Sequence, residues 1–188
     1  MKITQEFTVE RPVEAVWEQF QDVPAVAQCL PGATLTEDKG GGVYVGNIAV
    51  KLGPIAATFE GEANITSDPD NRRALIDGKG VDKKGGSRGQ VKVNYALSET
   101  GTGTTVKIDA DITLAGPAAQ FGRTGLINEM SRRLITDFSS CLEAKMAAPS
   151  EAVAAEIEAT QVKPFLLLLA SLASWLKSAF RKRRRPNN

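Results

Sequence analysis

The sequence predicts an α+β fold in which a curved, seven-stranded antiparallel sheet wraps around one long C-terminal helix. Two observations carry this prediction. One strand and two short helices precede a run of six strand-like segments, which are separated by turns rich in glycine, proline and aspartate. A long amphipathic segment without proline follows that run. Short strands joined by such turns pair as an antiparallel meander.

The N-terminal part predicts one strand followed by two short helices. Residues 3–9 alternate apolar and polar side chains, which indicates a strand with one buried face. Pro12 then opens a helix whose apolar side chains recur at helical spacing. Asp22 is the expected cap of a shorter helix over residues 23–28, which ends at the Leu-Pro-Gly turn of residues 30–32.

Six further strands are expected in the middle of the chain. Turn signals separate them, among them DKGGG at 38–42, SDPDN at 67–71 and TGTG at 100–103. Glycines at such turns supply positive φ angles, and the chain contains no phosphate-binding glycine motif. The expected strands cover residues 33–37, 43–52, 56–66, 73–82, 90–99 and 104–115.

The long helix is expected directly after the meander. A Gly-Pro pair at residues 116–117 ends the last strand, and residues 118–147 contain no proline. Leu126, Met130 and Leu134 begin a series of apolar side chains at spacings of three and four, which predicts an amphipathic helix. Residues 1–147 therefore form one domain, and we expect a cavity between the curled sheet and the helix.

The composition excludes several kinds of active site. The chain has no histidine, which removes histidine-based nucleophile systems, His-ligated zinc and imidazole acid–base steps. Two cysteines cannot by themselves supply a structural zinc site or an iron–sulfur cluster. The carboxylate pairs Glu60 with Glu62 and Asp109 with Asp111 each share one face of a strand, as paired acid–base chemistry requires, but a hydrated outer sheet face explains them equally well, because the small residues between their members suit an inward face. We therefore predict a protein that is not an enzyme and holds no metal.

The start of the chain predicts a cytoplasmic protein. The first ten residues alternate polar and apolar side chains and lack the apolar core of a signal peptide. Cysteines stay reduced in the cytoplasm. We therefore expect Cys29 and Cys141 to be reduced, small packed side chains rather than reactive thiols.

The charges of the chain are divided unevenly. The first 163 residues carry 17 basic and 22 acidic side chains, whereas the last 25 carry six basic and no acidic ones. The main domain is mildly acidic, so its charge argues against nucleic-acid binding. Residues 148–163 are small and acidic, and we expect them to form a linker that is partly helical.

Residues 164–188 are predicted to anchor the protein to a membrane. Phe165–Leu176 is a segment of 12 uncharged residues. As a helix it reaches roughly 18 Å, short of the hydrocarbon core of about 30 Å, which favours a helix lying in the interface over a single span. The basic cluster RKRRR follows and favours an anionic membrane surface. The expected membrane-binding residues are Phe165, Leu168, Leu169, Leu172, Trp175, Leu176, Phe180, Arg181, Lys182, Arg183, Arg184 and Arg185.

Three alternatives exist for the function of this tail. A helix that docks on a partner protein and a true tail anchor both suit the apolar segment. A nucleic-acid-binding tail is disfavoured, because the leucine run beside the basic cluster would have no role in it. Membrane association at the cytoplasmic face of the cell membrane remains the preferred prediction.

Four local strings stand out along the chain: CLPGA at 29–33, VKLGPI at 50–55, FEG at 59–61 and AGPAAQFGR at 115–123. In these strings the chain resembles the CoxG family of carbon monoxide dehydrogenase subunits, within the START-like (SRPBCC) superfamily of helix-grip domains. The strings occur in the family's order, on the expected elements, and the resemblance covers residues 1–147. Ala33 stands where the family often has a second cysteine, which argues against a role for a cysteine pair here.

The resemblance implies a non-enzymatic partner of a cytoplasmic molybdenum hydroxylase of the carbon monoxide dehydrogenase type, linking it to the membrane respiratory chain. It also implies an apolar ligand between sheet and helix. Combined with the membrane-seeking tail, this leads us to expect a respiratory quinone, menaquinone or ubiquinone, or a lipid, and no covalent cofactor. The expected ligand-binding residues are Phe59, Ala118, Phe121, Gly122, Gly125, Leu126 and Met130.

Two other functions stay open at this point. The first is a pure recruitment module with a filled core, which anchors the dehydrogenase at the membrane without a ligand. The second is a START-like hydrolase or cyclase, which needs polar groups that converge inside the cavity. Asn94, Tyr95 and Glu129 are the inward candidates, and they are scattered along the sequence.

Overall fold

A computed structural model describes residues 1–52, 55–123 and 126–159. It confirms the expected order of strand, two short helices, six strands and long helix. The elements are β1 (Lys2–Val9), α1 (Val13–Gln21), α2 (Val23–Gln28), β2 (Ala33–Asp38), β3 (Val43–Leu52), β4 (Ile55–Asp68), η1 (Pro69–Asn71), β5 (Arg73–Asp82), β6 (Ser87–Thr100), β7 (Gly103–Ala115), η2 (Gly116–Arg123), α3 (Leu126–Ala147) and α4 (Glu151–Glu156).

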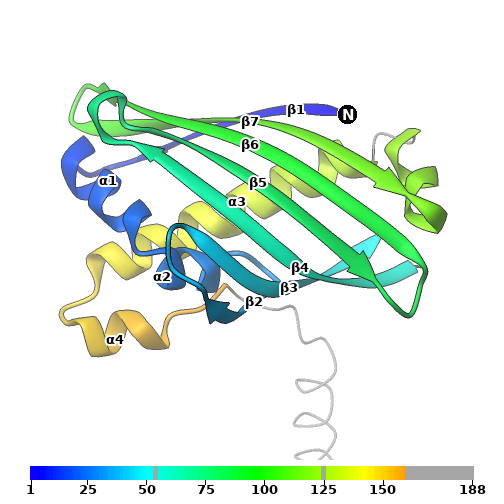
Figure 1. Cartoon of the computed structure of the whole chain (residues 1–188). Helices are drawn as coiled ribbons and strands as arrows, with labels where there is room; N and C mark the ends of the chain where they lie inside the picture. Colours follow the sequence, from blue (N-terminus) through cyan, green and yellow to red (C-terminus); the bar gives the residue numbers. More distant parts are fainter. Residues whose placement is uncertain (53–54, 124–125, 160–188) are drawn as a thin grey trace, which may run out of the picture.

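The seven strands form one antiparallel sheet in the order β1-β7-β6-β5-β4-β3-β2. Strands β2 to β7 are a meander, and β1 closes the far side by pairing with β7. Figure 1 shows the sheet curving over α3, with α1 and α2 gathered at one end of it. The predicted seven-stranded, curved sheet around a C-terminal helix is confirmed.

The hydrophobic core lies under the end of the sheet that α1 and the second half of α3 cover. Val9 of β1, Val16 of α1, Val106 of β7 and Leu142 of α3 are fully buried there. Phe138 of α3 is part of the same cluster. Its ring meets Phe7 and Phe20 edge-on, at centroid distances of 5.9 and 6.1 Å. Edge-to-face geometry adds to the stability that burial of these rings already provides.

The long helix begins later than the sequence pattern indicated. Residues 116–123 form the 3-10 segment η2, and α3 starts only at Leu126. Gly116 has a φ of 75°, and a Cβ at this position would lie 2.6 Å from the carbonyl oxygen of Gly86. The backbone N–H of Ala118 donates to Ser87 Oγ at 3.1 Å. These contacts hold η2 against the β5–β6 hairpin. Residues 118–123 therefore do not join the α-helix, although the sequence pattern predicted that they would.

The segment expected to be a linker contributes one short helix to the fold. Ser150 caps α4, and its Oγ accepts from the backbone N–H of Val153. Ala159 lies beyond α4 and is buried. Within the described residues, no helix has both the length and the apolar character that crossing a membrane requires.

Candidate functional site

A pocket of about 310 Å³ lies on the inner face of the sheet. Its wall is formed by strands β2 to β7 together with Ala27 of α2. The large side chains of this wall are half-buried, in contrast to those of the core. The inward-facing members are Leu35, Tyr44, Gly46, Ile48, Phe59, Gly61, Ala63, Gly78, Gly80, Gly89, Val91, Ile112 and Leu114. The inner face therefore offers an apolar surface that the described helices leave uncovered.

Four glycines form a straight row across the floor of this pocket. Gly46 on β3 pairs with Gly61 on β4, Gly61 with Gly80 on β5, and Gly80 with Gly89 on β6. The partner of Gly89 on β7 is Leu114, which ends the row. Since the row carries no side chains, it leaves space on the inner face of four neighbouring strands, part of which Phe59 occupies over Gly80 and Gly89. We call these four residues the glycine row.

The glycines of the row serve two different purposes. A Cβ on Gly61 would collide with the backbone carbonyl oxygen of Lys79, and one on Gly46 would lie 2.5 Å from that of Thr34. These two positions require glycine because neighbouring backbone approaches closely. A Cβ on Gly89 would meet only side chains at ordinary contact distances, the nearest being the Phe59 ring at 3.5 Å. Gly89 thus leaves room for the Phe59 ring, although the neighbouring backbone does not require a glycine there.

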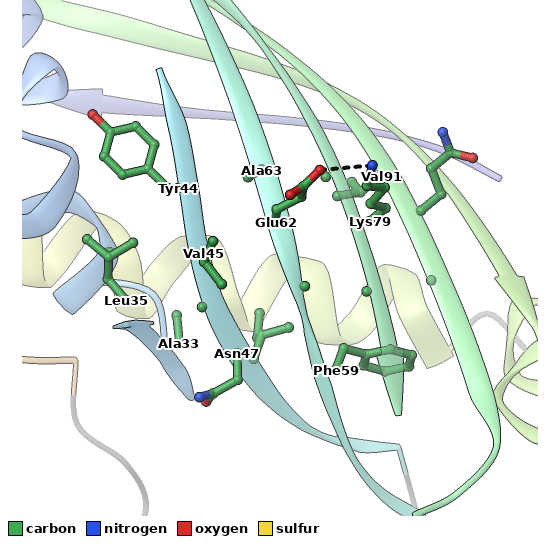
Figure 2. Close-up of a pocket in the computed structure, with 18 of the residues that line it drawn as sticks. Ala33, Leu35, Tyr44, Val45, Asn47, Phe59, Glu62, Ala63, Lys79 and Val91 are labelled. Atoms are coloured by element: carbon green, nitrogen blue, oxygen red, sulfur yellow. Dashed lines mark ion pairs between the residues drawn. The ribbon is translucent and has the colours of Figure 1, made fainter. Parts of the chain in front are cut away.

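Phe59 and Tyr44 are the two aromatic side chains of the pocket wall. In Figure 2 they lie at opposite ends of the pocket, and the strand register places the glycine row between them. Phe59 leans over Gly80 and Gly89, because these glycines leave room for its ring. Burial is the main cause that raises the pKa of the Tyr44 hydroxyl, and the negative charges of Asp38 and Asp22 add to it. Tyr44 therefore stays a neutral donor or acceptor at the pocket edge.

The structure places only part of the predicted ligand-binding set at the pocket. Phe59 is in the wall. Ala118 is fully buried in η2, and Met130 lies half-buried on α3. Neither of them is among the described residues of the wall. Gly125 and all the expected membrane-binding residues of the tail, from Phe165 to Arg185, lie outside the described residues, and for Phe121, Gly122 and Leu126 only the backbone is described.

Comparison with known families identifies the domain. The family model of CoxG, a subunit of carbon monoxide dehydrogenase, matches residues 6–147. The chain belongs to the CoxG family. No curated protein sequence matches the chain.

Solved structures place the CoxG domain in the START-like fold. A conserved protein from Geobacillus kaustophilus is similar with a TM-score of 0.67 and 16% identity, over 78% of this chain and 95% of that one. A START superfamily protein from Mycobacterium smegmatis is similar with a TM-score of 0.54 and 11% identity, over 77% and 96% of the two chains. The di-domain aromatase/cyclase BexL of the BE-7585A pathway gives 0.50 and 13%, over 80% and 51%. At these low sequence identities, the structural similarity shows a shared fold and nothing further.

The three polar candidates of the sequence, all among the described residues, do not converge at the pocket of this CoxG domain. Asn94 is exposed on the outer face, and Glu129 is exposed on α3, with its Oε2 3.7 Å from Arg132. Tyr95 is buried in the core between Trp17 and Phe20, and burial raises its pKa to about 12. These three expected candidates therefore lie apart from one another and are not part of the pocket wall.

The carboxylate pairs lie on the outer face of the sheet, as expected. Glu62 receives a hydrogen bond from Lys79 at 2.9 Å, drawn in Figure 2, and this contact lowers the pKa of the Glu62 carboxyl. Glu60 is paired with Lys83, and Asp111 with the amino terminus. Exposed pairs of this kind add little to stability. Among the described residues, no group of three acidic or cysteine side chains is placed to hold a metal ion.

The expectation of two reduced cysteines is wrong in this structure. Cys29, at the end of α2, and Cys141, on α3, form a disulfide with a Cα–Cα distance of 5.4 Å. The two residues are 112 positions apart, so only the packing of α2 against α3 brings them within bonding range. The resemblance placed the family's second cysteine at position 33, where this chain has Ala33. The partner of Cys29 is instead Cys141 on α3. Both cysteines are buried, which shields the bond from thiols in solution.

A buried lysine joins α2, α3 and α4 next to this disulfide. The ammonium of Lys145 donates to Gln28 Oε1 and to the carbonyl oxygen of Ala154, both at 2.7 Å. Lys145 is 4% exposed, and burial lowers its pKa, although Asp22 and Glu158 act in the opposite direction. The backbone N–H of Ala159 donates to the carbonyl oxygen of Gln28 at 2.9 Å. The last described residue is therefore fixed to α2. Sequence patterns missed this junction, because a lysine on an amphipathic helix ordinarily indicates an exposed face.

Proposed function

We propose that this CoxG protein binds an apolar molecule, a respiratory quinone or a lipid, in the pocket above the glycine row. In this proposal the protein is a non-enzymatic accessory factor. It links a cytoplasmic molybdenum hydroxylase of the carbon monoxide dehydrogenase type to the membrane respiratory chain. The single observation that carries the proposal is the uncovered apolar pocket in a domain of this family.

The shape and chemistry of the pocket support an apolar, partly flat ligand. Its volume of about 310 Å³ is at the lower end of ligand-binding pockets, which run from roughly 300 to 1,000 Å³. A flat ring system fits a floor without side chains, and the Phe59 ring offers an aromatic contact at its end. Tyr44 supplies a hydroxyl at the other end, which suits a carbonyl oxygen of a quinone.

The tail supports the membrane half of the proposal. An apolar segment followed by RKRRR provides the two signals, insertion and attraction to anionic lipid, that stable anchoring needs. An apolar ligand dissolved in the bilayer reaches a protein most easily when that protein is held at the bilayer surface. We therefore propose that residues 164–188 hold the domain at the cytoplasmic face of the cell membrane.

Organic extraction and mass spectrometry test the ligand directly. The full chain is purified from a quinone-producing bacterium, extracted, and the apolar molecules are counted per chain. We expect close to one quinone or lipid per chain, and a rise in Tm when decylubiquinone is added to emptied protein. Phe59→Ala should reduce the Tm shift, whereas Thr58→Ala, on the outer face of the same strand, should leave it unchanged.

An empty protein whose Tm ignores decylubiquinone would contradict ligand binding. If that protein still sedimented with anionic vesicles, the recruitment module would be the better account. Loss of vesicle binding when Arg181, Lys182, Arg183, Arg184 and Arg185 are all replaced by glutamine would support the membrane half independently.

A further inference from the structure

The last described residue of the chain lies beside the pocket. Ala159 is bound through its backbone N–H to Gln28, and the residue before Gln28, Ala27, is part of the pocket wall. The anchor point is rigid, because the Cys29–Cys141 disulfide and the two hydrogen bonds of Lys145 hold α2, α3 and α4 together. The remaining chain therefore starts from a fixed position at the α2 side of the pocket.

The remaining chain carries an apolar segment within reach of the pocket. Residues 160–164 separate Ala159 from Phe165. Five residues span at most about 17 Å when extended. The 12 uncharged residues that follow include Leu168, Leu169 and Leu172, which share one side of a helix. A helix is about 10 Å wide, so a pocket of about 310 Å³ admits leucine side chains from such a face and not the helix itself.

The charges of the two parts are complementary. Six basic side chains follow residue 163, whereas the preceding part carries a surplus of acidic ones. Asp38 ends β2 and Asp22 caps α2, and both of these elements contribute residues to the pocket wall. Acidic groups thus stand at the edge of the pocket from which the tail departs.

We propose that, away from a membrane, the segment Phe165–Leu176 docks its leucines into the pocket of its own domain. This inference rests on the proposed function, because it makes the tail and the apolar ligand alternative occupants of one site. Without a membrane, docking buries two apolar surfaces that would otherwise face water. At a membrane the segment inserts into the lipid, and the pocket opens where its ligand is dissolved.

Photo-crosslinking tests the docking. Benzoylphenylalanine replaces Leu172 in the full chain, and the protein is irradiated without vesicles. We expect cross-links within one molecule to residues of β2 to β6 that form the pocket wall. They should disappear with vesicles of phosphatidylethanolamine and phosphatidylglycerol. The same probe at Ser98, exposed on β6 at the far end of the sheet, should give none to the wall in either condition. Absence of wall cross-links at position 172, or cross-links only between molecules, would overturn the proposal.

Ligand competition provides the second measurement. A pocket covered nine-tenths of the time shows an apparent Kd about tenfold weaker than the open pocket. Replacing Leu168→Glu together with Leu172→Glu in the full chain should therefore tighten decylubiquinone binding in vesicle-free buffer by about that factor. Gly89→Val and Ala63→Leu fill the pocket in two independent ways, and either should remove both the quinone signal and the cross-links.

The outcomes separate this inference from the proposed function. If decylubiquinone binds equally well to the parent protein and to the tail variant, tail docking is overturned and ligand binding stands. If decylubiquinone binds neither protein while the cross-links to the wall persist, docking is supported and the ligand proposal fails.

Discussion

The two ends of the sheet's inner face differ in what they carry and in how they are covered. At one end, Tyr95, Leu97 and Val106 point inward and are buried under α1 and α3. At the other end, strands of the same sheet present the glycine row, and the apolar side chains around it are only half-buried. The same curved sheet is therefore a packed core at one end and an open pocket at the other.

This difference shows that the pocket results from missing side chains. Glycine within a strand weakens it, because glycine loses much backbone freedom and contributes no packing. A Cβ on Gly80 would be tight, at 3.2 Å from Phe59 Cβ and 3.3 Å from the Glu60 carbonyl oxygen, whereas one on Gly89 would meet only side chains, the nearest being the Phe59 ring at 3.5 Å. A sheet selected for stability alone would fill this end. The open end is therefore the part of the domain where a binding function is expected.

Replacing one phenylalanine at each end tests the comparison most strongly. Phe138→Ala removes a 4% exposed ring from the aromatic cluster, and we expect a loss of about 3–5 kcal/mol in the free energy of unfolding. Phe59→Ala removes a half-buried ring and should cost only about 1–2 kcal/mol. Urea unfolding followed by circular dichroism measures both. Equal losses would mean that the pocket end is packed in solution.

Removal of the Cys29–Cys141 disulfide should have the next largest effect on stability. Both cysteines belong to the core cluster at the packed end of the sheet. Cys29→Ala combined with Cys141→Ala opens a loop of 112 residues, and we expect a loss of about 2–4 kcal/mol. Wild-type protein reduced after unfolding should lose a similar amount, which controls for the cavities left by alanine. The affinity for decylubiquinone should stay within about twofold, because the glycine row lies outside this cluster. Lost affinity would show that the two ends are coupled.

The fold could be predicted because its signals are local. Alternation in β1, the turn motifs of the meander and the helical spacing from Leu126 onward are each readable within one segment. Antiparallel pairing then follows from the short connections. The start of α3 could not be placed in this way, because Gly116 and Ser87 fix η2 through contacts with a distant hairpin.

The pocket and the junction depended on pairings between distant segments. Each of the strands β3 to β6 contributes one glycine to the row. The four glycines line up only because of the register in which these strands pair. Likewise, Cys29 and Cys141 meet only once α2 has packed against α3. Phe59 belongs to the expected ligand-binding set, whereas Tyr44 and Lys145 carry no signal in the sequence.

Two glycines within the row distinguish backbone demand from open space. Gly61→Ala forces a Cβ against the carbonyl of Lys79, and we expect a loss of about 1–3 kcal/mol. Gly89→Ala places its methyl group at ordinary distance from Phe59 and should change stability by less than about 1 kcal/mol. Thermal unfolding ranks the two variants. Gly89→Ala should nonetheless weaken decylubiquinone binding, since it raises the floor of the pocket. A severe loss of stability in Gly89→Ala would instead make the whole row structural.

The smallest expected effect uses the two tyrosines of the chain, one at each end of the inner face. Burial raises the pKa of Tyr95 to about 12, and that of Tyr44 is raised as well. Because the pKa of the Tyr95 hydroxyl is higher in the folded protein than in the unfolded chain, its neutral form contributes to the stability of the fold. This contribution is complete below pH 10 and is lost as the pH rises toward 12. For Tyr95 the loss is about 1.4 kcal/mol at about pH 11. Tyr95→Phe should remove this part of the alkaline destabilisation.

Ultraviolet titration of the phenolate bands measures the same contrast directly. We expect Tyr44 to ionise first, because it is half-buried, and Tyr95 to ionise last, because it is 7% exposed in the core. Tyr44→Phe identifies which band belongs to which residue. Filling the pocket with decylubiquinone should raise the pKa of Tyr44 further, by excluding water from its hydroxyl, and leave that of Tyr95 unchanged. A ligand that moved only the Tyr95 band would place the binding site at the packed end.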